Sequence, residues 1–421
     1  MPQARHPCPS HDAAPPGTAP APAFARCQGL ALWAALGAAL GFAAWGEGRA
    51  PLPALALPLL VSSAPSRAQA FCVAAGYAAA LLRHAVAFIA AWFEHRWIVG
   101  MAGVAAYVLL TGAVWSCGWT GSPRLRDRAA AISLAWCLAL LASAAVPGHP
   151  LIAAGFALPG TGWLGVALAA LSPAVALTLG AAAPPAMRRA LLAVLVLTLV
   201  GAGLLLRAQP NLSRFGSIDA WSTTWGPLAG TDVALQRLQN MGSITSASPA
   251  RVVVWPESIL GRYEPALAPV LDIELLRPAR EADRTLVIGM DLPMAGNRLR
   301  NTAVAFYPDG RRAVAIARQP APLSLWKPWR RSDTFVADWR ASNLLDLPDG
   351  ERAAVIFCYE EYVPLLYLLN EAFDAPTLYL ALANTWAARE PEAAAIQTWH
   401  SLGMARLFGR PYLKAENRPV P

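Results

Sequence analysis

The sequence predicts a polytopic α-helical membrane domain followed by an α/β domain. The 421 residues are 56% hydrophobic and only 14% charged, with a mean hydropathy of +0.39. Charged residues make up about a quarter of a typical soluble chain, so this composition indicates a membrane protein. The apolar bias extends to about Arg207, and beyond it charged residues and turn signals recur every few positions. The length is sufficient for two domains.

Residues 1–28 are rich in Pro, Ala and Ser without apolar periodicity, which predicts a disordered N-terminal tail. From 29 to 206, successive apolar runs predict a transmembrane helical domain of about seven spans. The runs are 29–46, 51–64, 69–92, 97–118, 129–147, 157–182 and 189–206. The second is short for a full crossing. The third contains Arg83 and His84 in its middle, which predicts a broken or tilted span, or one that lines a polar pocket.

The placement of arginines predicts the orientation. If the N-terminus is cytoplasmic, the outer loops hold only Arg49 and Arg96. The inner loops then hold the larger set, as the positive-inside rule requires: Arg67, Arg124, Arg126, Arg128, Arg188 and Arg189. An odd number of spans places residues 207–421 outside the cytoplasm. The net charge of +8 is spread through loops without a basic cluster, so no nucleic-acid partner is expected.

Beyond residue 216 the pattern alternates between strands and helices. Strands are predicted at 217–221, 251–255, 284–290, 353–357, 377–383 and 411–415, and a hairpin at 302–307 and 311–317 turns at Pro308-Asp309-Gly310. Helices are predicted at 231–241, 362–372 and 393–407. This alternation predicts a sheet whose faces are covered by helices. No Gly-rich phosphate loop is present, and we expect neither a cofactor nor a metal site.

The strand at 353–357 ends in Cys358. The other five cysteines all precede residue 140, so Cys358 has no disulfide partner in its half of the chain. It is therefore a free thiol or a nucleophile. A nucleophilic thiol needs a base or a positive neighbour, whereas a lone cysteine is more often a buried and inert residue.

Two further polar residues follow apolar strands. Glu257 comes after the strand at 251–255, where burial would raise its pKa into the range of a general base. Asn384 follows the strand at 377–383 and can hydrogen-bond a neighbouring loop or a substrate. Taken alone, Glu257 is better explained as a surface residue after a strand, and Asn384 can be a simple turn residue. Together with Cys358 they indicate a site, because sites in α/β sheets gather where strands end.

The second half of the chain resembles the carbon–nitrogen hydrolase (nitrilase) superfamily, and within it the membrane branch of apolipoprotein N-acyltransferases. The resemblance covers about 200 residues, and the preceding spans match as well. It is carried by the following blocks: Trp255-Pro256-Glu257, Asn301-Thr302-Ala303-Val304, Asp309-Gly310, Cys358-Tyr359-Glu360, Ala383-Asn384-Thr385-Trp386, and Gln397, His400, Met404-Ala405-Arg406 and Gly409-Arg410-Pro411.

The resemblance implies a nitrilase-like αββα sandwich with a Glu–Lys–Cys triad, on the periplasmic side of a bacterial inner membrane. Glu257 would be the general base, Cys358 would attack an acyl carbonyl to form a thioester, and a lysine would stabilise the oxyanion. Tyr359, Glu360, Asn384 and Trp386 would support the site. The family's acyl donor is a phospholipid, and its acceptor is the amino-terminal cysteine of a lipoprotein.

The sequence departs from the family at the lysine. Gln319 stands at the lysine's position, Arg318 is its neighbour, and Lys327 falls where the family has a loop glutamate. Lys327 is our candidate for the third catalytic residue, and the alternatives are that Arg318 reaches the site or that no cation does. Arginine differs from lysine in geometry, and loss of an oxyanion donor costs roughly two to three orders of magnitude in rate.

The family continues past the position of Asn417 with further strands and a last span, so we expect a C-terminally shortened sandwich. The overall length and the segment Gln319-Pro320, Trp326 and Pro328-Trp329 resemble conjugal-transfer proteins of transmissible plasmids. This resemblance implies a partner in the conjugation apparatus, or a lipoprotein. Three functions remain open: a Cys358-dependent acyltransferase or amidase, a weakly active or inactive accessory protein that binds an acyl or peptide group, and a purely structural component.

Overall fold

The computed structural model describes residues 23–46, 48–93, 95–181, 184–205, 212–228, 230–388 and 391–419. Of the predicted tail, residues 1–22 lie outside the described residues. Residues 23–28 form the beginning of a helix rather than a disordered segment.

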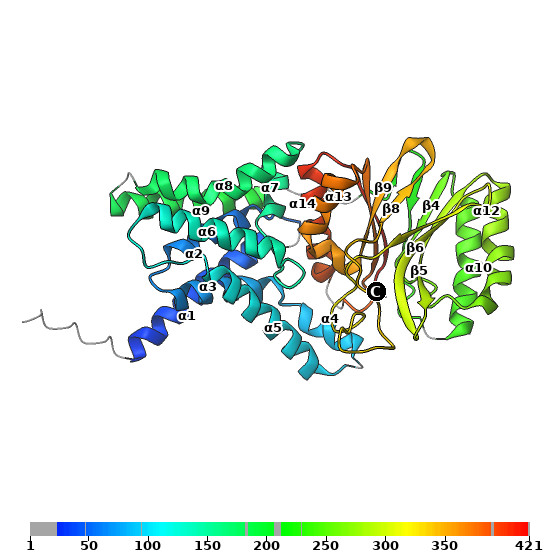
Figure 1. Ribbon diagram of the computed structural model, residues 1–421, viewed down its shortest axis with the longest axis horizontal. Helices are drawn as coiled ribbons and strands as arrows, with labels where there is room; N and C mark the ends of the chain where they lie inside the picture. The colour runs from blue at the N-terminus through cyan, green and yellow to red at the C-terminus, as the bar shows by residue number, and fades with distance from the viewer. Residues whose placement is uncertain are drawn as a thin grey trace, which may run out of the picture.

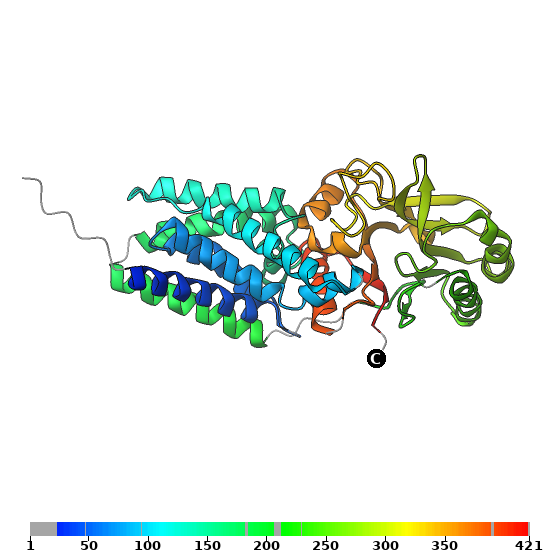
Figure 2. The same ribbon diagram turned by 90° about the horizontal axis from the view of Figure 1, so that it is seen from below.

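Up to residue 205 the described chain is helical, and its longer helices run side by side along the long axis of the molecule (Figure 2). The helices are α1 (Ala23–Ala44), η1 (Leu52–Ala56), α2 (Leu57–Ser63), α3 (Arg67–Leu81), α4 (Ala85–Trp92), α5 (Trp97–Ser116), α6 (Leu125–Leu141), α7 (Leu151–Ala157), α8 (Gly162–Ala181) and α9 (Pro185–Leu205).

These helices supply fewer candidate spans than the seven predicted. Among the described residues, only α1 and α5 are long and apolar enough to cross a membrane unbroken. Two bent pairs, α3 with α4 and α7 with α8, raise the number to four if each counts as one span. The apolar run 51–64 forms η1 and α2, which are both too short to cross.

The predicted break in the third run is confirmed. α3 and α4 meet at 64° around the turn that holds Arg83 and His84. The guanidinium of Arg83 donates to the carbonyl oxygens of Ala80 at 3.0 Å and of Trp45 at 3.2 Å. A charged side chain in an apolar segment is thus held by backbone acceptors.

Two sheets follow, drawn to the right of the helices in Figure 1. The six-stranded sheet has the order β1-β2-β4-β5-β6-β7, and the five-stranded sheet has the order β3-β11-β10-β9-β8. Their strands are β1 (Arg214–Phe215), β2 (Ile218–Ala220), β3 (Ser222–Thr223), β4 (Val252–Trp255), β5 (Thr285–Met294), β6 (Arg298–Phe306), β7 (Arg312–Ile316), β8 (Leu344–Asp346), β9 (Arg352–Phe357), β10 (Leu378–Asn384) and β11 (Tyr412–Asn417).

The sheets pack face to face over an apolar core that includes Val254 and Val287 from one sheet and Val355, Leu380 and Leu413 from the other. α10 (Thr231–Ala247), α11 (Ala268–Leu271) and α12 (Arg277–Glu281) lie on the outer face of the six-stranded sheet. α13 (Pro364–Phe373) and α14 (Pro391–Leu407) lie on the outer face of the other (Figure 1). The structure therefore has the four-layer α–β–β–α order that the resemblance implied.

The elements predicted after residue 216 are all present, with ends shifted by a few residues. The hairpin forms as predicted: β6 pairs with β7 in antiparallel register from Phe306 opposite Arg312 to Thr302 opposite Ile316. The turn needs Gly310, whose φ is +85°. The sequence analysis missed β1, β3, β8, α11 and α12, which are all short.

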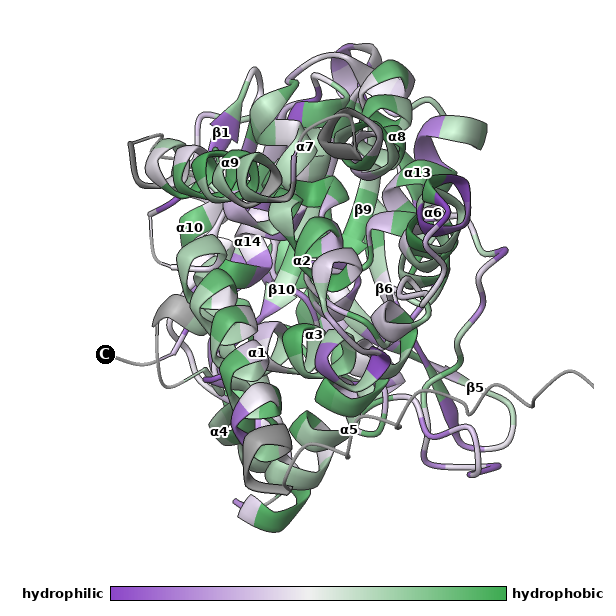
Figure 3. Ribbon diagram, turned by 90° about the vertical axis from the view of Figure 1, so that its left-hand side faces the viewer, coloured by the Kyte–Doolittle hydropathy of each residue, from purple (hydrophilic) through white to green (hydrophobic). Residues whose placement is uncertain are grey.

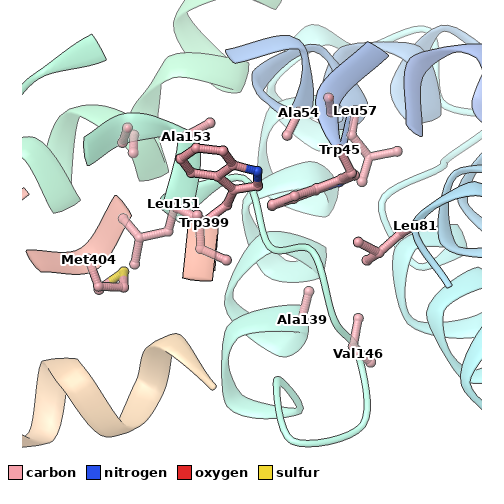
Figure 4. Close-up of a cluster of buried hydrophobic side chains, with 14 of the residues drawn as sticks. Trp45, Ala54, Leu57, Leu81, Ala139, Val146, Leu151, Ala153, Trp399 and Met404 are labelled. Atoms are coloured by element: carbon pink, nitrogen blue, oxygen red, sulfur yellow. The ribbon is translucent and has the colours of Figure 1, made fainter. Parts of the chain in front are cut away.

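α14 joins the sandwich to the helical part. Trp399 and Met404 from α14 share one apolar cluster with Leu151 of α7 and with Trp45 (Figure 4). The backbones of α7 and α14 touch at Gly155, where a Cβ atom would lie only 1.7 Å from the carbonyl oxygen of Gly403. Only glycine permits this approach.

A larger residue at Gly155 should therefore separate α7 from α14. We expect Gly155→Leu to lower the free energy of unfolding by about 1–3 kcal/mol, as overpacking does elsewhere. Thermal unfolding of the full chain in detergent measures this. In Gly201→Ala, on α9, the new Cβ meets nothing within 4 Å, and this matched control should be at least as stable as the parent. Equal stability of the two variants would contradict the α7–α14 packing described here.

Candidate functional site

Cys358 lies where the strands of the five-stranded sheet end. β9, β10 and β11 are parallel, so their carboxyl ends meet at one edge. Cys358 follows β9 and begins the 3₁₀ helix η5 (Cys358–Tyr362), while β10 ends at Asn384 and β11 at Asn417. The predicted strand-end position of the thiol is therefore present in the structure.

Glu257 comes from the opposite sheet, after β4, and is buried. Asn301 on β6 donates from Nδ2 to Glu257 Oε1 at 2.5 Å. Gly289 on β5 makes room for this turn, because a Cβ there would lie 2.2 Å from the carbonyl oxygen of Pro256. Burial raises the pKa of Glu257 to about 8, although the Asn301 hydrogen bond acts to lower it. A carboxyl with this pKa is suited to general-base work near neutral pH.

The thiol of Cys358 lies half-buried beside this carboxyl. Its Sγ lies 3.9 Å from the carbonyl oxygen of Asn384 and 3.3 Å from Gln397 Nε2. Burial, and next the negative charge of Glu257, raise the pKa of the Cys358 thiol well above its usual value. At neutral pH the resting site therefore holds a protonated thiol, and proton transfer must accompany nucleophilic attack.

Thiol and carboxyl share a cavity of about 160 Å³. One side consists of apolar residues from the helical part: Leu81, Leu82, Ala85, Phe88, Ile89, Trp92 and Phe93. Another side is the loop from Pro320 to Leu325. Polar lining residues include Glu257, Asn301, Cys358 and Gln397, and His84 from the α3–α4 turn. The cavity thus combines reactive polar groups with an apolar wall supplied by the broken α3–α4 pair.

None of the predicted cations reaches this cavity. Arg318 points away: its guanidinium donates to Ala341 O at 2.9 Å and Asn370 Oδ1 at 2.6 Å, and it pairs with Asp374 at 3.1 Å. Lys327 is not among the residues that line the cavity, which corrects its proposed place at the site. Among the described lining residues there is neither a lysine nor an arginine.

Gln319, at the family's lysine position, lines the cavity but uses its amide elsewhere. Its Nε2 donates to Pro320 O at 3.0 Å, and its Oε1 accepts from Trp339 Nε1 at 3.0 Å. Gln319 therefore forms part of the wall and gives the thiol no donor.

Of the four predicted supporting residues, only Tyr359 lines the cavity. Buried Glu360 accepts from the backbone N–H groups of Gln319 at 2.8 Å and of Phe357 at 3.0 Å, so it ties the turn at Cys358 to the segment after β7. Burial raises its pKa to about 7, although these backbone hydrogen bonds oppose the shift. Tyr359 lines the cavity and hydrogen-bonds Tyr107 of α5 at 2.9 Å and the Ala144 carbonyl oxygen.

The side chain of Asn384 does not line the cavity, and its Oδ1 accepts from Asn417 Nδ2 at 3.0 Å. Trp386 also lies outside the lining and packs on Trp92 of α4, with ring centroids 5.3 Å apart. Asn384 thus links the ends of β10 and β11, and Trp386 packs against α4. Among the described residues no group of three or more His, Cys, Asp or Glu side chains could hold a metal ion.

No protein-family model matches the chain. The conjugal transfer protein TraB of Agrobacterium fabrum is 30% identical over 426 residues, which cover 92% of this chain and 93% of that protein. The chain belongs to the TraB family of conjugal transfer proteins. The probable conjugal transfer protein TraB of Sinorhizobium fredii is 26% identical over 410 residues and covers 90% of this chain and 95% of its own. The resemblance to plasmid conjugal-transfer proteins is thereby confirmed.

Solved structures of the nitrilase superfamily overlap less closely with this TraB family member. An amidase from Nesterenkonia sp. matches 48% of this chain and 76% of its own, at 20% identity and a TM-score of 0.34. A carbon–nitrogen hydrolase from Helicobacter pylori G27 matches 46% of this chain and 70% of its own, at 13% identity and a TM-score of 0.35. For a mutant of the Nesterenkonia amidase the chain spans only 63% of that structure, at a TM-score of 0.30. These scores are too low to support an argument about mechanism.

Three residues in or next to this cavity were not predicted from the sequence. Asn301 and Gln397 occur in the blocks that carry the resemblance, but neither was assigned a role. Lys414 is one of only two lysines in the chain, the other being Lys327, and it is fully buried on β11. The near absence of lysine among 34 basic residues was the signal that could have drawn attention to it.

The raised pKa of Glu257 predicts a pH-dependent stability. The folded protein retains a proton that the unfolded chain releases near the ordinary glutamate pKa of 4.5, so stability should fall as pH rises from there to about 8. Within this window each pH unit costs about 1.4 kcal/mol from this group. Glu257→Gln should flatten that dependence, as measured by denaturant unfolding across the window. The matched change at exposed Glu264 should leave the slope as in the parent, and equal slopes for both variants would disprove this origin.

Proposed function

We propose that this conjugal transfer protein uses Cys358 to accept an acyl group in a covalent thioester. The observation that carries the proposal is the shared cavity, which is lined by the Cys358 thiol, the Glu257 carboxyl and apolar residues of the helical part. A nucleophile and a base in one desolvated site are what acyl transfer requires.

The reaction balances without a cofactor. Cys358 Sγ attacks the acyl carbonyl carbon while its proton moves to Glu257. The tetrahedral intermediate then expels the donor's alkoxide or amine, which takes the proton from Glu257. An amine or water next attacks the thioester carbonyl, and its proton returns through Glu257 to the thiolate sulfur. The products are the acylated acceptor, or the free acid, and the original thiol.

The apolar wall supports a lipid acyl group as substrate, and we propose a phospholipid as the donor. α4 carries Phe88, Ile89 and Trp92 into the cavity, and α4 is half of a bent apolar pair. Contact with acyl chains fits this composition better than contact with a polar metabolite. A lipoprotein, or a component of the conjugation apparatus, is the acceptor that we propose.

The exposed surface of the helical part supports placement in the bacterial inner membrane. Ile98, Leu164 and Leu197 are 78%, 64% and 68% exposed, and Figure 3 shows hydrophobic residues around these helices. Apolar surface of this kind indicates contact with lipid. We propose a multi-pass arrangement with the sandwich on the periplasmic side, as the arginine distribution predicts.

A second function is favoured by one observation, the lack of a lysine or arginine among the described lining residues. Without a cation near the oxyanion, turnover would be slower by roughly two to three orders of magnitude. The protein would then be an accessory protein of conjugation that holds an acyl or peptide group.

The thioester tests the first function directly. Full-length protein in detergent is incubated with phospholipid vesicles, and we expect a peptide containing Cys358 to gain the mass of one acyl chain. Hydroxylamine should remove this mass, since it cleaves thioesters, and Cys358→Ala should never show it. Release of the acyl group to an added amine supports acyl transfer. A stable adduct, or lipid binding without an adduct, supports the accessory function instead.

Alkylation tests the role of Glu257. Iodoacetamide should label Cys358 near neutral pH, and Glu257→Gln should slow this labelling at least tenfold because the base is lost. Peptide mass spectrometry separates Cys358 from the exposed thiols of Cys27, Cys117 and Cys137, which serve as internal controls. Equal rates in parent and variant would rule out a thiol activated by Glu257.

A further inference from the structure

Lys414 is a fully buried ammonium on β11, with 0% of its side chain exposed. Its Nζ lies 3.1 Å from Glu361 Oε1 and 3.5 Å from Glu416 Oε1. Burial of such a charge costs several kcal/mol unless it is paired. Although burial opposes the ammonium, these two carboxylates raise the pKa of Lys414, so it stays charged.

Lys414 also contacts α14. Its Nζ donates to Gln397 Oε1 at 3.2 Å and to Thr398 Oγ1 at 3.1 Å. An ammonium has three donors and no acceptor, so the amide atom that faces it must be the carbonyl oxygen. The orientation of the Gln397 amide is thus determined chemically, although oxygen and nitrogen of such a group are otherwise hard to tell apart.

The other end of the same amide meets the nucleophile. Gln397 Nε2 lies 3.3 Å from Cys358 Sγ and also donates to the carbonyl oxygen of Cys358. A flipped amide would point its oxygen at the sulfur and at that carbonyl, and its nitrogen at the ammonium. Both ends would then be mismatched.

We propose that Lys414 is a positioning residue for the nucleophile: it locks the Gln397 amide so that an N–H donor is held on Cys358 Sγ. The inference rests on the proposed function in taking Cys358 as the nucleophile. Gln397 touches the reacting sulfur, whereas Lys414 acts only through Gln397. A hydrogen bond to a charged acceptor is stronger than one to a neutral acceptor, so this donor favours the thiolate over the thiol.

The charges around Lys414 show that it acts through the amide rather than as a free cation. Glu361 Oε2 is held by Ser401 Oγ at 2.6 Å and by the Tyr412 hydroxyl at 2.5 Å. Glu416 is also paired with Arg418, at 3.1 Å. Two cations thus face two carboxylates, which leaves little net charge to act on the sulfur from a distance.

Other titratable groups also face the thiol and must be held constant in a test. They come from the segment after β4, from η5, from the α3–α4 turn and from β11: Glu257, Tyr359, Glu360, Glu361, Tyr362, His84 and Lys414. Of these, Glu257 and Glu361 act to raise the pKa of Cys358 through their negative charges. Removal of Glu361 alone should therefore lower that pKa, in the direction opposite to loss of the donor.

The pH profile of Cys358 alkylation in the full-length protein tests the inference. Lys414→Met combined with Glu361→Gln removes both charges, so that neither the ammonium nor the Glu361 carboxylate is left buried without its partner. We expect the midpoint of Cys358 alkylation in this double variant to lie about one pH unit or more above the midpoint in Glu361→Gln alone. Gln397→Met removes the donor itself and should raise the midpoint above the parent's by a similar amount. Adding the Gln397 change to the double variant should give no further rise, because both act on one hydrogen bond.

Thr398→Val is the matched control, since it removes the other Lys414 hydrogen bond on α14 but leaves the amide contact. Its profile should match the parent's. Identical midpoints for the double variant and Glu361→Gln, with unfolding temperatures close to the parent's, would overturn the inference. If the double variant does not fold, the Gln397→Met profile decides, and an unchanged midpoint there also overturns it. The thioester measurement is independent of this test. If the parent protein forms the thioester adduct, the proposed function stands even when the Lys414 substitution leaves the alkylation midpoint unchanged.

Discussion

The packing of α14 against α7 fixes the geometry on which the site depends. Gly155 and Gly403 bring the two backbones into contact, and Trp399 of α14 lies in the apolar cluster shared with the helical part. The same helix carries Gln397, which touches the sulfur of Cys358. One helix therefore packs against the helical part and also presents Gln397 to the sulfur. The contact between Tyr359 and Tyr107 is a second tie between the turn at Cys358 and α5.

The second constraint is electrostatic. Glu257 and Glu360 are buried and Cys358 is half-buried, and desolvation raises the pKa of all three groups. The low-dielectric surroundings therefore favour neutral forms. The described lining residues include no lysine or arginine that would reverse this preference, so reactivity depends on hydrogen-bond donors held in place by the fold.

Much of the sandwich could be predicted from the sequence because its strands are short apolar runs bounded by turn residues. β9 and β4 were both found this way, and the polar residue after each strand indicated Cys358 and Glu257. The position of the site at the carboxyl ends of the strands also followed, because sites in α/β sheets gather where strands end. The turn between α3 and α4 was indicated by Arg83 and His84, whereas hydropathy gave no signal for the sharp bend between α7 and α8.

The cation was misplaced for a related reason. Lys327 was considered because it is near the family's lysine in sequence, but nearness in sequence does not place an amino group in a cavity. Lys414 lies almost a hundred positions from Gln319 and meets the site only because β11 pairs with β10 and is covered by α14. Asn384 shows the same limit of prediction from sequence position. It lies at the end of its strand as predicted, but its side chain accepts a hydrogen bond from Asn417.

The resting site is suited to a cavity with an apolar wall. A thiol and a carboxylic acid that both keep their protons place no charge against Phe88 and Ile89, so the empty cavity avoids the cost of a buried ion. Attack starts from the form in which Glu257 has released its own proton: the carboxylate accepts the thiol proton, and negative charge appears on the sulfur as it attacks. Water solvates that charge poorly in an apolar cavity, so a donor that already points at the sulfur lowers the barrier. The Gln397 amide, held at its other end by Lys414, is such a donor and needs no reorganisation when the reaction begins.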